Sequence, residues 1–82
     1  MAMSTERAPN VNGARLTNRE LEVLGHAVEG KFARQIADDM HISKRTVDFH
    51  LANIYGKLRA RNRFEAMRLG LRLGLVKIEV RT

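Results

Sequence analysis

The chain has 82 residues, with 15 Lys and Arg against nine Asp and Glu, and a formal net charge of +6. This length suits a single domain with a modest core, and the absence of cysteine excludes disulfide bonds, thiolate metal sites and cysteine nucleophiles. No apolar run reaches the ~18 residues that a membrane-spanning helix needs, so a soluble, cytoplasmic protein is expected.

The chain begins with a segment that shows no apolar period. Residues 1–15 include Pro9 and Gly13, residues typical of turns and flexible segments. We therefore predict a flexible N-terminal tail over 1–15 and one folded domain over 16–82.

A first helix is predicted over 18–29. Thr17 and Glu20 have the spacing of a capping box, in which each side chain accepts a hydrogen bond from the backbone N–H of the other residue. Apolar residues then recur at helical spacing, and Gly30 is the expected left-handed stop.

The second and third helices are predicted over 33–40 and 44–58, joined by a tight turn at His41 and Ile42, with Ser43 as the cap of the third. In the second helix, Ile36, Ala37 and Met40 are expected to face inward. The apolar stripe of the third helix consists of Val47, Leu51, Ile54 and Leu58. Such a pair presents its second helix to the major groove of DNA, although similar pairs also occur in proteins that bind no DNA.

A fourth helix follows, because Asn62 and Glu65 repeat the capping pattern. It is expected to end near Gly74. Its predicted inward stripe consists of Ala66, Met67, Gly70 and Leu71. Four short helices without a strand pattern predict an all-α fold, a four-helix bundle that contains a helix-turn-helix.

Charge is distributed unevenly along these helices. Residues 16–43 carry three Lys or Arg and five Asp or Glu, whereas residues 44–72 carry eight and two. A basic half beside an acidic half is typical of a surface that binds a polyanion, and a solvated basic surface is the alternative.

The face of the third helix opposite its apolar stripe carries the candidate base contacts. At about 100° per residue, this face contains Arg45, Asp48, Phe49 and Ala52. Arg45 suits a guanine, the Asp48 carboxylate suits a cytosine amino group, and Phe49 or Ala52 suits a thymine methyl. The predicted phosphate contacts on this helix are Lys44, Thr46, Asn53 and Lys57. The alternative for Phe49 is burial under another segment.

Several short motifs follow one another along the chain: Leu16-Thr17-Asn18-Arg19-Glu20, Glu29-Gly30 before Ile36-Ala37, Ile42 to His50, Asn53-Ile54-Tyr55 and Asn62-Arg63. Residues 16 to about 76 thereby resemble the LuxR-type (GerE- and FixJ-like) DNA-binding domain of bacterial transcription regulators. The Thr46–His50 form is similar to members with an autoinducer-binding domain, and response-regulator members stay open as the alternative.

The resemblance implies a four-helix domain that binds DNA as a dimer, with the third helix in the major groove and the fourth against its twin. Asp48, Phe49 and Ala52 fall where the family contacts bases, and Arg34 and Lys44 where it meets phosphate. Leu69, Arg72 and Leu73 are the candidate dimer seam, with packing of the two leucines under 75–80 as the alternative. The expected partners are double-stranded DNA, a second copy in a weak homodimer and, as an open alternative, RNA polymerase.

Four positions depart from the family pattern. Lys31-Phe32 stands where a helix cap is usual, Gly56 lies inside a helix, Arg59 replaces a glycine stop, and Asp48 stands where lysine is common. An aspartate there repels phosphate and lowers non-specific affinity for DNA, so operator preference does not transfer from the family.

No catalytic constellation is predicted, since His26, His41 and His50 lie on different elements; no cofactor, metal or small-molecule ligand within this chain is expected. The competing function is a protein-interaction module that uses Phe49, Leu69 and Leu73, with incidental basic charge. RNA binding is less favoured, because the few aromatic residues form no stacking surface.

Overall fold

The computed structural model describes residues 10–11 and 14–77. Its helices are α1 (Asn18–Val28), α2 (Ala33–Met40), α3 (Lys44–Leu58) and α4 (Arg63–Arg72), preceded by two short strands, β1 (Asn10–Val11) and β2 (Ala14–Arg15). The predicted all-α class is confirmed, and the predicted helix bounds agree to within about two residues.

The two strands pair antiparallel, with Asn10 opposite Arg15 and Val11 opposite Ala14. These strands lie in a segment for which the sequence predicts a flexible tail and no strand. The rest of that tail, residues 1–9 and 12–13, lies outside the described residues.

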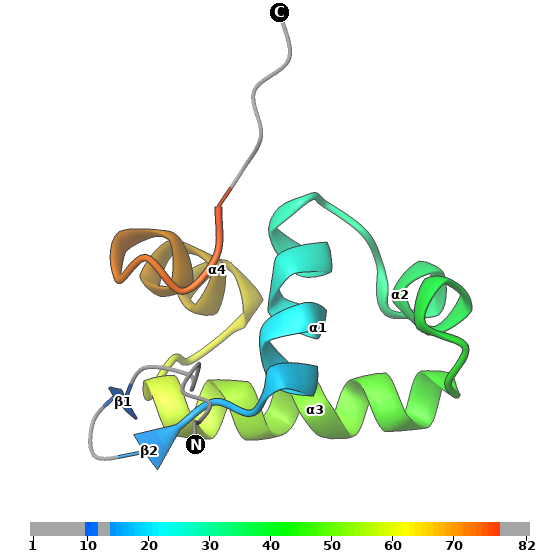
Figure 1. Ribbon diagram of the computed structural model, residues 1–82, viewed down its shortest axis with the longest axis horizontal. Helices are drawn as coiled ribbons and strands as arrows, with labels where there is room; N and C mark the ends of the chain where they lie inside the picture. The colour runs from blue at the N-terminus through cyan, green and yellow to red at the C-terminus, as the bar shows by residue number, and fades with distance from the viewer. Residues whose placement is uncertain (1–9, 12–13, 78–82) are drawn as a thin grey trace, which may run out of the picture.

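Helix α3 is the base on which the other helices pack. It contacts α1, α2 and α4, and α1 in turn contacts both α2 and α4. In Figure 1, α3 runs along the bottom, α1 stands above its middle, and α2 and α4 lie on either side of α1. One long face of α3 therefore carries no other helix in this view.

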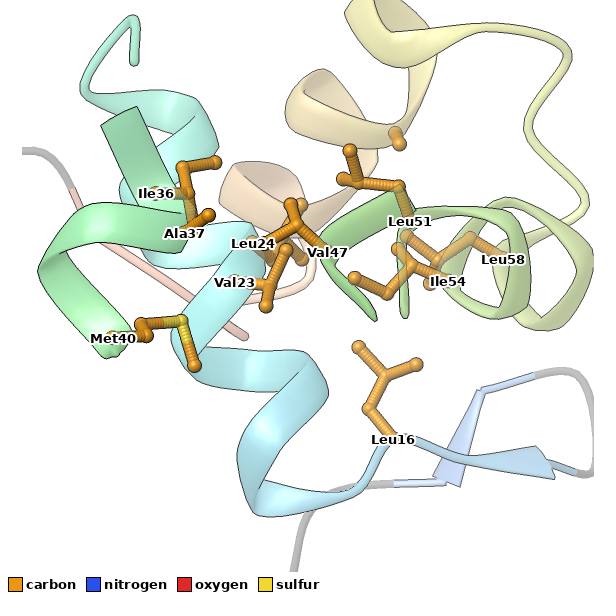
Figure 2. Packing of buried hydrophobic residues seen from close by; sticks show 11 residues of the cluster. Leu16, Val23, Leu24, Ile36, Ala37, Met40, Val47, Leu51, Ile54 and Leu58 are labelled. Carbon is orange, nitrogen blue, oxygen red and sulfur yellow. The ribbon is translucent and has the colours of Figure 1, made fainter. Parts of the chain in front are cut away.

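The core lies where these helices meet (Figure 2). Val23 and Leu24 of α1, Ile36 of α2, and Val47 and Ile54 of α3 are fully buried. The predicted apolar stripe of α3 and the inward residues of α2 are confirmed as core. These contacts fix which side of α3 faces outward, because a helix turned about its axis would expose this stripe.

Side-chain caps form at the three helix starts where the sequence predicts them. Thr17 and Glu20 make the complete capping box, and Ser43 Oγ accepts from Thr46 N at 3.0 Å. Asn62 Oδ1 accepts from the Glu65 backbone N–H at 2.9 Å. The Glu65 carboxylate, however, accepts from the Arg61 backbone N–H rather than from Asn62.

Left-handed residues follow all four helices. Gly30 follows α1 at φ 90°, as predicted, and Gly74 follows α4 at φ 74°, while His41 and Arg59 follow α2 and α3 at φ 58° and 57°. A non-glycine residue in this conformation costs about 1–2 kcal/mol. Arg59 therefore does enter the conformation of the glycine that it replaces.

The beginning of α4 is fastened to the end of α1 by Arg63. Its guanidinium donates to the Ala27 carbonyl oxygen at 3.2 Å and to the Lys31 carbonyl oxygen. The Ala27 carbonyl belongs to the last turn of α1, where carbonyl groups have no partner within the helix. Arg63 thereby joins two segments more than 30 residues apart.

The predicted inward stripe of α4 is partly wrong. Ala66 and Gly70 are buried, but Leu71 is 37% exposed, and Leu69 packs partly buried against the core. The physical reason is the close approach at Gly70, where an added Cβ would lie 2.9 Å from Leu24 Cδ2. With Gly70 against Leu24, Leu69 rather than Leu71 packs against the core.

Replacing Gly56 by alanine is expected to stabilise the domain. An added Cβ would meet nothing within 4 Å, and alanine is favoured over glycine in a helix interior by about 0.5–1 kcal/mol. Urea unfolding should show this increase in the free energy of unfolding. The matched change Gly70→Ala should lower it, because Leu24 lies in the way; effects of equal sign would contradict this packing.

Candidate nucleic-acid interface

The four candidate base contacts share the exposed face of α3. Arg45, Asp48, Phe49 and Ala52 are all exposed, at the i, i+3, i+4, i+7 spacing of one helix side. Phe49 is 63% exposed, so among the described residues nothing covers it. The structure thus brings a cation, a carboxylate and two apolar groups onto one convex surface.

The candidate phosphate contacts lie around this face in two groups. Arg34 and Lys44 are exposed at the beginnings of α2 and α3, whereas Thr46, Asn53 and Lys57 are half-buried. Thr46 Oγ1 lies 2.9 Å from Ser43 Oγ, within the α3 cap. Arg34 and Lys44 are therefore better placed than the half-buried residues to contact a ligand.

The helix beginnings differ in charge. α1 and α4 carry Glu20 and Glu65 in their first turns, each beside one arginine, so that the charge at these helix starts is balanced. Neither α2 nor α3 carries an acid there; instead Arg34, Lys44 and Arg45 stand in these turns. Cations at this end cost up to about 1 kcal/mol each, so positive potential gathers at the helix-turn-helix and favours an anionic ligand.

Two residues with separate predicted roles are paired with each other. Lys44 Nζ donates to Asp48 Oδ2 at 2.8 Å, and both side chains are at least half exposed, at 58% and 50%. An exposed pair at this spacing contributes about 0.3–0.5 kcal/mol. The interaction is therefore easily exchanged for a stronger one.

Lys57 makes internal contacts in place of an open phosphate site. Its ammonium donates to Glu20 Oε1 at 2.8 Å and to the Arg15 carbonyl oxygen at 2.9 Å. These bonds connect the C-terminal half of α3 with β2 and the beginning of α1. The predicted phosphate contact of Lys57 competes with this structural role.

Glu20 is the buried partner in that contact. The residue is 3% exposed, and its Oε1 also accepts from the Thr17 backbone N–H at 2.9 Å. Burial raises the pKa of the carboxyl, but the bonds from Lys57 and Thr17 outweigh it, and the pKa lies below the ordinary value. The capping spacing identified Glu20 in the sequence; nothing in the sequence indicated Lys57, 37 positions away.

A second polar cluster joins the ends of α1 and α2. Lys31 Nζ lies 2.7 Å from Asp39 Oδ2, 3.2 Å from His26 Nδ1 and 3.4 Å from Glu29 Oε1. The hydrogen bond with Asp39 raises the pKa of Lys31 and lowers that of Asp39. The sequence does not indicate this cluster, because the turn between the helices brings its members together.

The three histidines lie on α1, after α2 and on α3, as the sequence indicated. His50 Nδ1 is buried and lacks a hydrogen-bond partner within the described part of the chain. Over residues 10–11 and 14–77, no group of three or more His, Cys, Asp or Glu side chains is arranged to hold a metal ion. No helix in the same ranges has the length and hydropathy to cross a membrane.

The candidate dimer seam on α4 is exposed in part. Arg72 is exposed and Leu73 is 50% exposed, directly after the helix, whereas Leu69 packs partly against the core. Leu71, which was predicted inward, is also exposed, but at about 100° per residue it lies on the other side of the helix. The exposed apolar surface around Leu73 is therefore small.

Comparisons with known proteins agree with this architecture. Residues 14–69 match the family described as bacterial regulatory proteins, luxR family. The chain is 43% identical over 65 residues to the transcriptional activator protein SolR of Ralstonia nicotianae, covering 79% of this chain and 28% of SolR. It is 45% identical over 64 residues to RpaR of Rhodopseudomonas palustris, a HTH-type quorum sensing-dependent transcriptional regulator, covering 78% and 26%.

A relative of another description also matches. The uncharacterized response regulatory protein YgeK of Escherichia coli is 38% identical over 63 residues, which cover 77% of this chain and 43% of YgeK. The chain thus spans about a quarter of the length of SolR and of RpaR and less than half of YgeK.

Glu20→Gln is expected to destabilise the domain and to weaken its acid sensitivity. Because folding lowers the pKa of Glu20, the unfolded state takes up its proton first as pH falls. The stabilisation is therefore present above about pH 4.3, the ordinary value for glutamate, and is lost as pH drops through the folded value. At neutral pH the variant should lose about 1–3 kcal/mol.

Urea unfolding from neutral to acid pH checks this expectation. Glu22→Gln is the matched control, because Glu22 lies on the same helix in an exposed pair with Arg19, and such pairs contribute little. Parallel pH profiles for the Glu20 variant and the original protein would contradict a stabilising role for the buried carboxylate.

Proposed function

Because the chain belongs to the luxR family of bacterial regulatory proteins, we propose that it binds double-stranded DNA in a sequence-specific manner and regulates transcription. The observation that supports this most is the outward face of α3, where exposed polar and apolar groups share one side of a helix that follows a tight turn. The relatives SolR and RpaR bear the names of a transcriptional activator and a transcriptional regulator.

In this proposal α3 enters the major groove, with its N-terminal half against the base edges. The Arg45 guanidinium donates to the O6 and N7 atoms of a guanine, and the Asp48 carboxylate accepts from the N4 amino group of a cytosine. Phe49 and Ala52 contact thymine methyl groups. The i, i+3, i+4 and i+7 spacing presents these side chains together.

Phosphates flank the groove and hold the helix in register. Arg34 and Lys44 donate to phosphates at the beginnings of α2 and α3, and Thr46 and Asn53 lie at the edges of the same surface. The absence of acidic residues in the first turns of α2 and α3 supports this assignment. Lys57 is left out of the phosphate contacts, because its ammonium already donates to the Glu20 carboxylate.

Two copies are proposed to associate through the exposed end of α4, around Arg72 and Leu73 with an edge of Leu69. A two-fold pair of this kind would place two α3 helices on two half-sites of one operator. The small exposed apolar surface supports a weak dimer, stabilised mainly by DNA.

Arg45→Ala and Phe49→Ala are expected to lose preference for a selected site over random duplex DNA. The Arg45 change removes a guanine contact that contributes about 1–3 kcal/mol to discrimination, and the Phe49 change removes an apolar contact. Fluorescence-anisotropy titrations on both duplexes at two salt concentrations check this, and affinity should fall with salt because counterions are released.

Arg19→Ala is the control, because it removes a cation from the exposed surface of α1. It should leave the ratio of the two affinities unchanged. Failure of the original protein to bind any duplex at low salt would reject the DNA-binding proposal and favour a protein-interaction surface around Phe49.

Leu73→Glu is expected to weaken binding to a duplex with two half-sites, and to leave binding to one half-site unchanged. A charge at this half-exposed position opposes burial of the seam. Phe64→Glu is the matched control, since Phe64 is 70% exposed and, at about 100° per residue, lies on the opposite side of α4. Equal losses on both duplexes would contradict the α4 dimer.

A further inference from the structure

We propose that Lys44 exchanges partners on DNA, and that this exchange makes Asp48 the determinant of a preference for one C·G base pair. In non-specific complexes Lys44 stays paired with Asp48; on the preferred site Asp48 accepts from a cytosine amino group and Lys44 moves to a phosphate. The inference rests on the proposed function and adds to it a specificity-determining residue and a positioning residue.

The ion pair between Lys44 and Asp48 joins two candidate contact positions. Lys44 Nζ and Asp48 Oδ2 lie 2.8 Å apart on successive turns of α3, and both side chains are at least half exposed. Asp48 stands among the candidate base contacts and Lys44 among the candidate phosphate contacts. One ion pair therefore bridges two positions that DNA would contact separately.

The ion pair between Lys44 and Asp48 is weak. A lysine that precedes its acidic partner by four residues has the less favourable order on a helix, and water screens both groups. Lys44 also stands at the positive end of the α3 dipole. The lysine gains from a new anionic partner, and its flexible stem allows it to reach one.

Near DNA, the Asp48 carboxylate needs a cationic or hydrogen-bonding partner. An unpaired carboxylate in the groove would be repelled by the phosphates, so at a site without a donor its best partner remains Lys44. A cytosine amino group offers a donor to the carboxylate. With that bond formed, Lys44 can donate to a phosphate, in the shorter and stronger hydrogen bond of two charged groups.

The exchange changes the number of phosphates that each protomer neutralises. The logarithm of the binding constant falls with the logarithm of salt concentration by about 0.9 for each neutralised phosphate. We therefore expect the slope per protomer to be steeper on the preferred site than on random DNA, with about 0.9 of the difference due to Lys44.

Salt titrations of Lys44→Met and Asp48→Ala test this, using a site enriched from random duplexes by the original protein. Lys44→Met should make the slope on the selected site shallower by about 0.9 and leave the slope on random DNA unchanged. Asp48→Ala should steepen the slope on random DNA by about 0.9, because Lys44 is then released in both complexes.

A chemical probe identifies the base pair. Each cytosine of the selected site is replaced in turn by N4-methylcytosine, which keeps base pairing and puts a methyl group in the groove where the free N–H would be. One replacement should lower the affinity of the original protein for the duplex by about tenfold and leave the affinity of the Asp48→Ala variant unchanged.

The exposed pair between Arg19 and Glu22 on α1 provides the matched controls, because its atoms lie 3.2 Å apart with similar exposure. Arg19→Met and Glu22→Ala make the same charge changes and should alter neither slope by more than a small, equal amount.

The outcomes separate the two proposals. No binding of the original protein to any duplex rejects the proposed function itself. Binding with equal slope changes for Lys44→Met on both DNAs overturns the exchange, since Lys44 would then meet phosphate in every complex. An N4-methylcytosine effect that persists in Asp48→Ala overturns the assignment of Asp48.

Discussion

The buried carboxylate of Glu20 ties the beginning of α1 to the C-terminal half of α3. One oxygen accepts from the Thr17 backbone and from the Lys57 ammonium, so a local helix cap is also a long-range connection. Because α1 packs across the middle of α3, this connection helps to fix both the position of α3 and its rotation. The outward face of α3, on which the proposed function depends, is what remains after these inward contacts are made.

Helix-end electrostatics distinguish the supporting helices from those of the helix-turn-helix. The first turns of α1 and α4 each hold an arginine and a glutamate, whereas those of α2 and α3 hold cations and no acid. The caps do not follow this division, because Ser43 caps α3 with its side chain, whereas Phe32 offers no side-chain acceptor at the start of α2. The beginning of α2 is therefore the one helix start of the described residues that carries cationic charge without a side-chain cap.

What the sequence predicts well here is local. Caps at Thr17, Ser43 and Asn62 gave the helix bounds, and helical spacing gave the buried stripe and the exposed face of α3. The contacts of Lys57 and Arg63 escaped prediction because each joins residues more than 30 positions apart. The rotation of α4 depends on how closely Gly70 approaches Leu24, a tertiary distance that spacing alone does not determine. The Lys44–Asp48 pair has a local spacing, but the helix pattern alone indicates separate DNA contacts for its two members.

The bond between Arg63 and the α1–α2 connection has a mechanical consequence. Because Arg63 at the start of α4 is bonded to the Ala27 carbonyl in α1 and to the Lys31 carbonyl in the loop that follows, α4 is held to the rest of the domain by more than the chain segment 59–62. In the proposed dimer built on α4, the separation of the two α3 helices would then be set by a rigid connection within each domain rather than by a flexible loop. In the proposed dimer, a longer segment 59–62 would then leave the spacing of the two α3 helices unchanged.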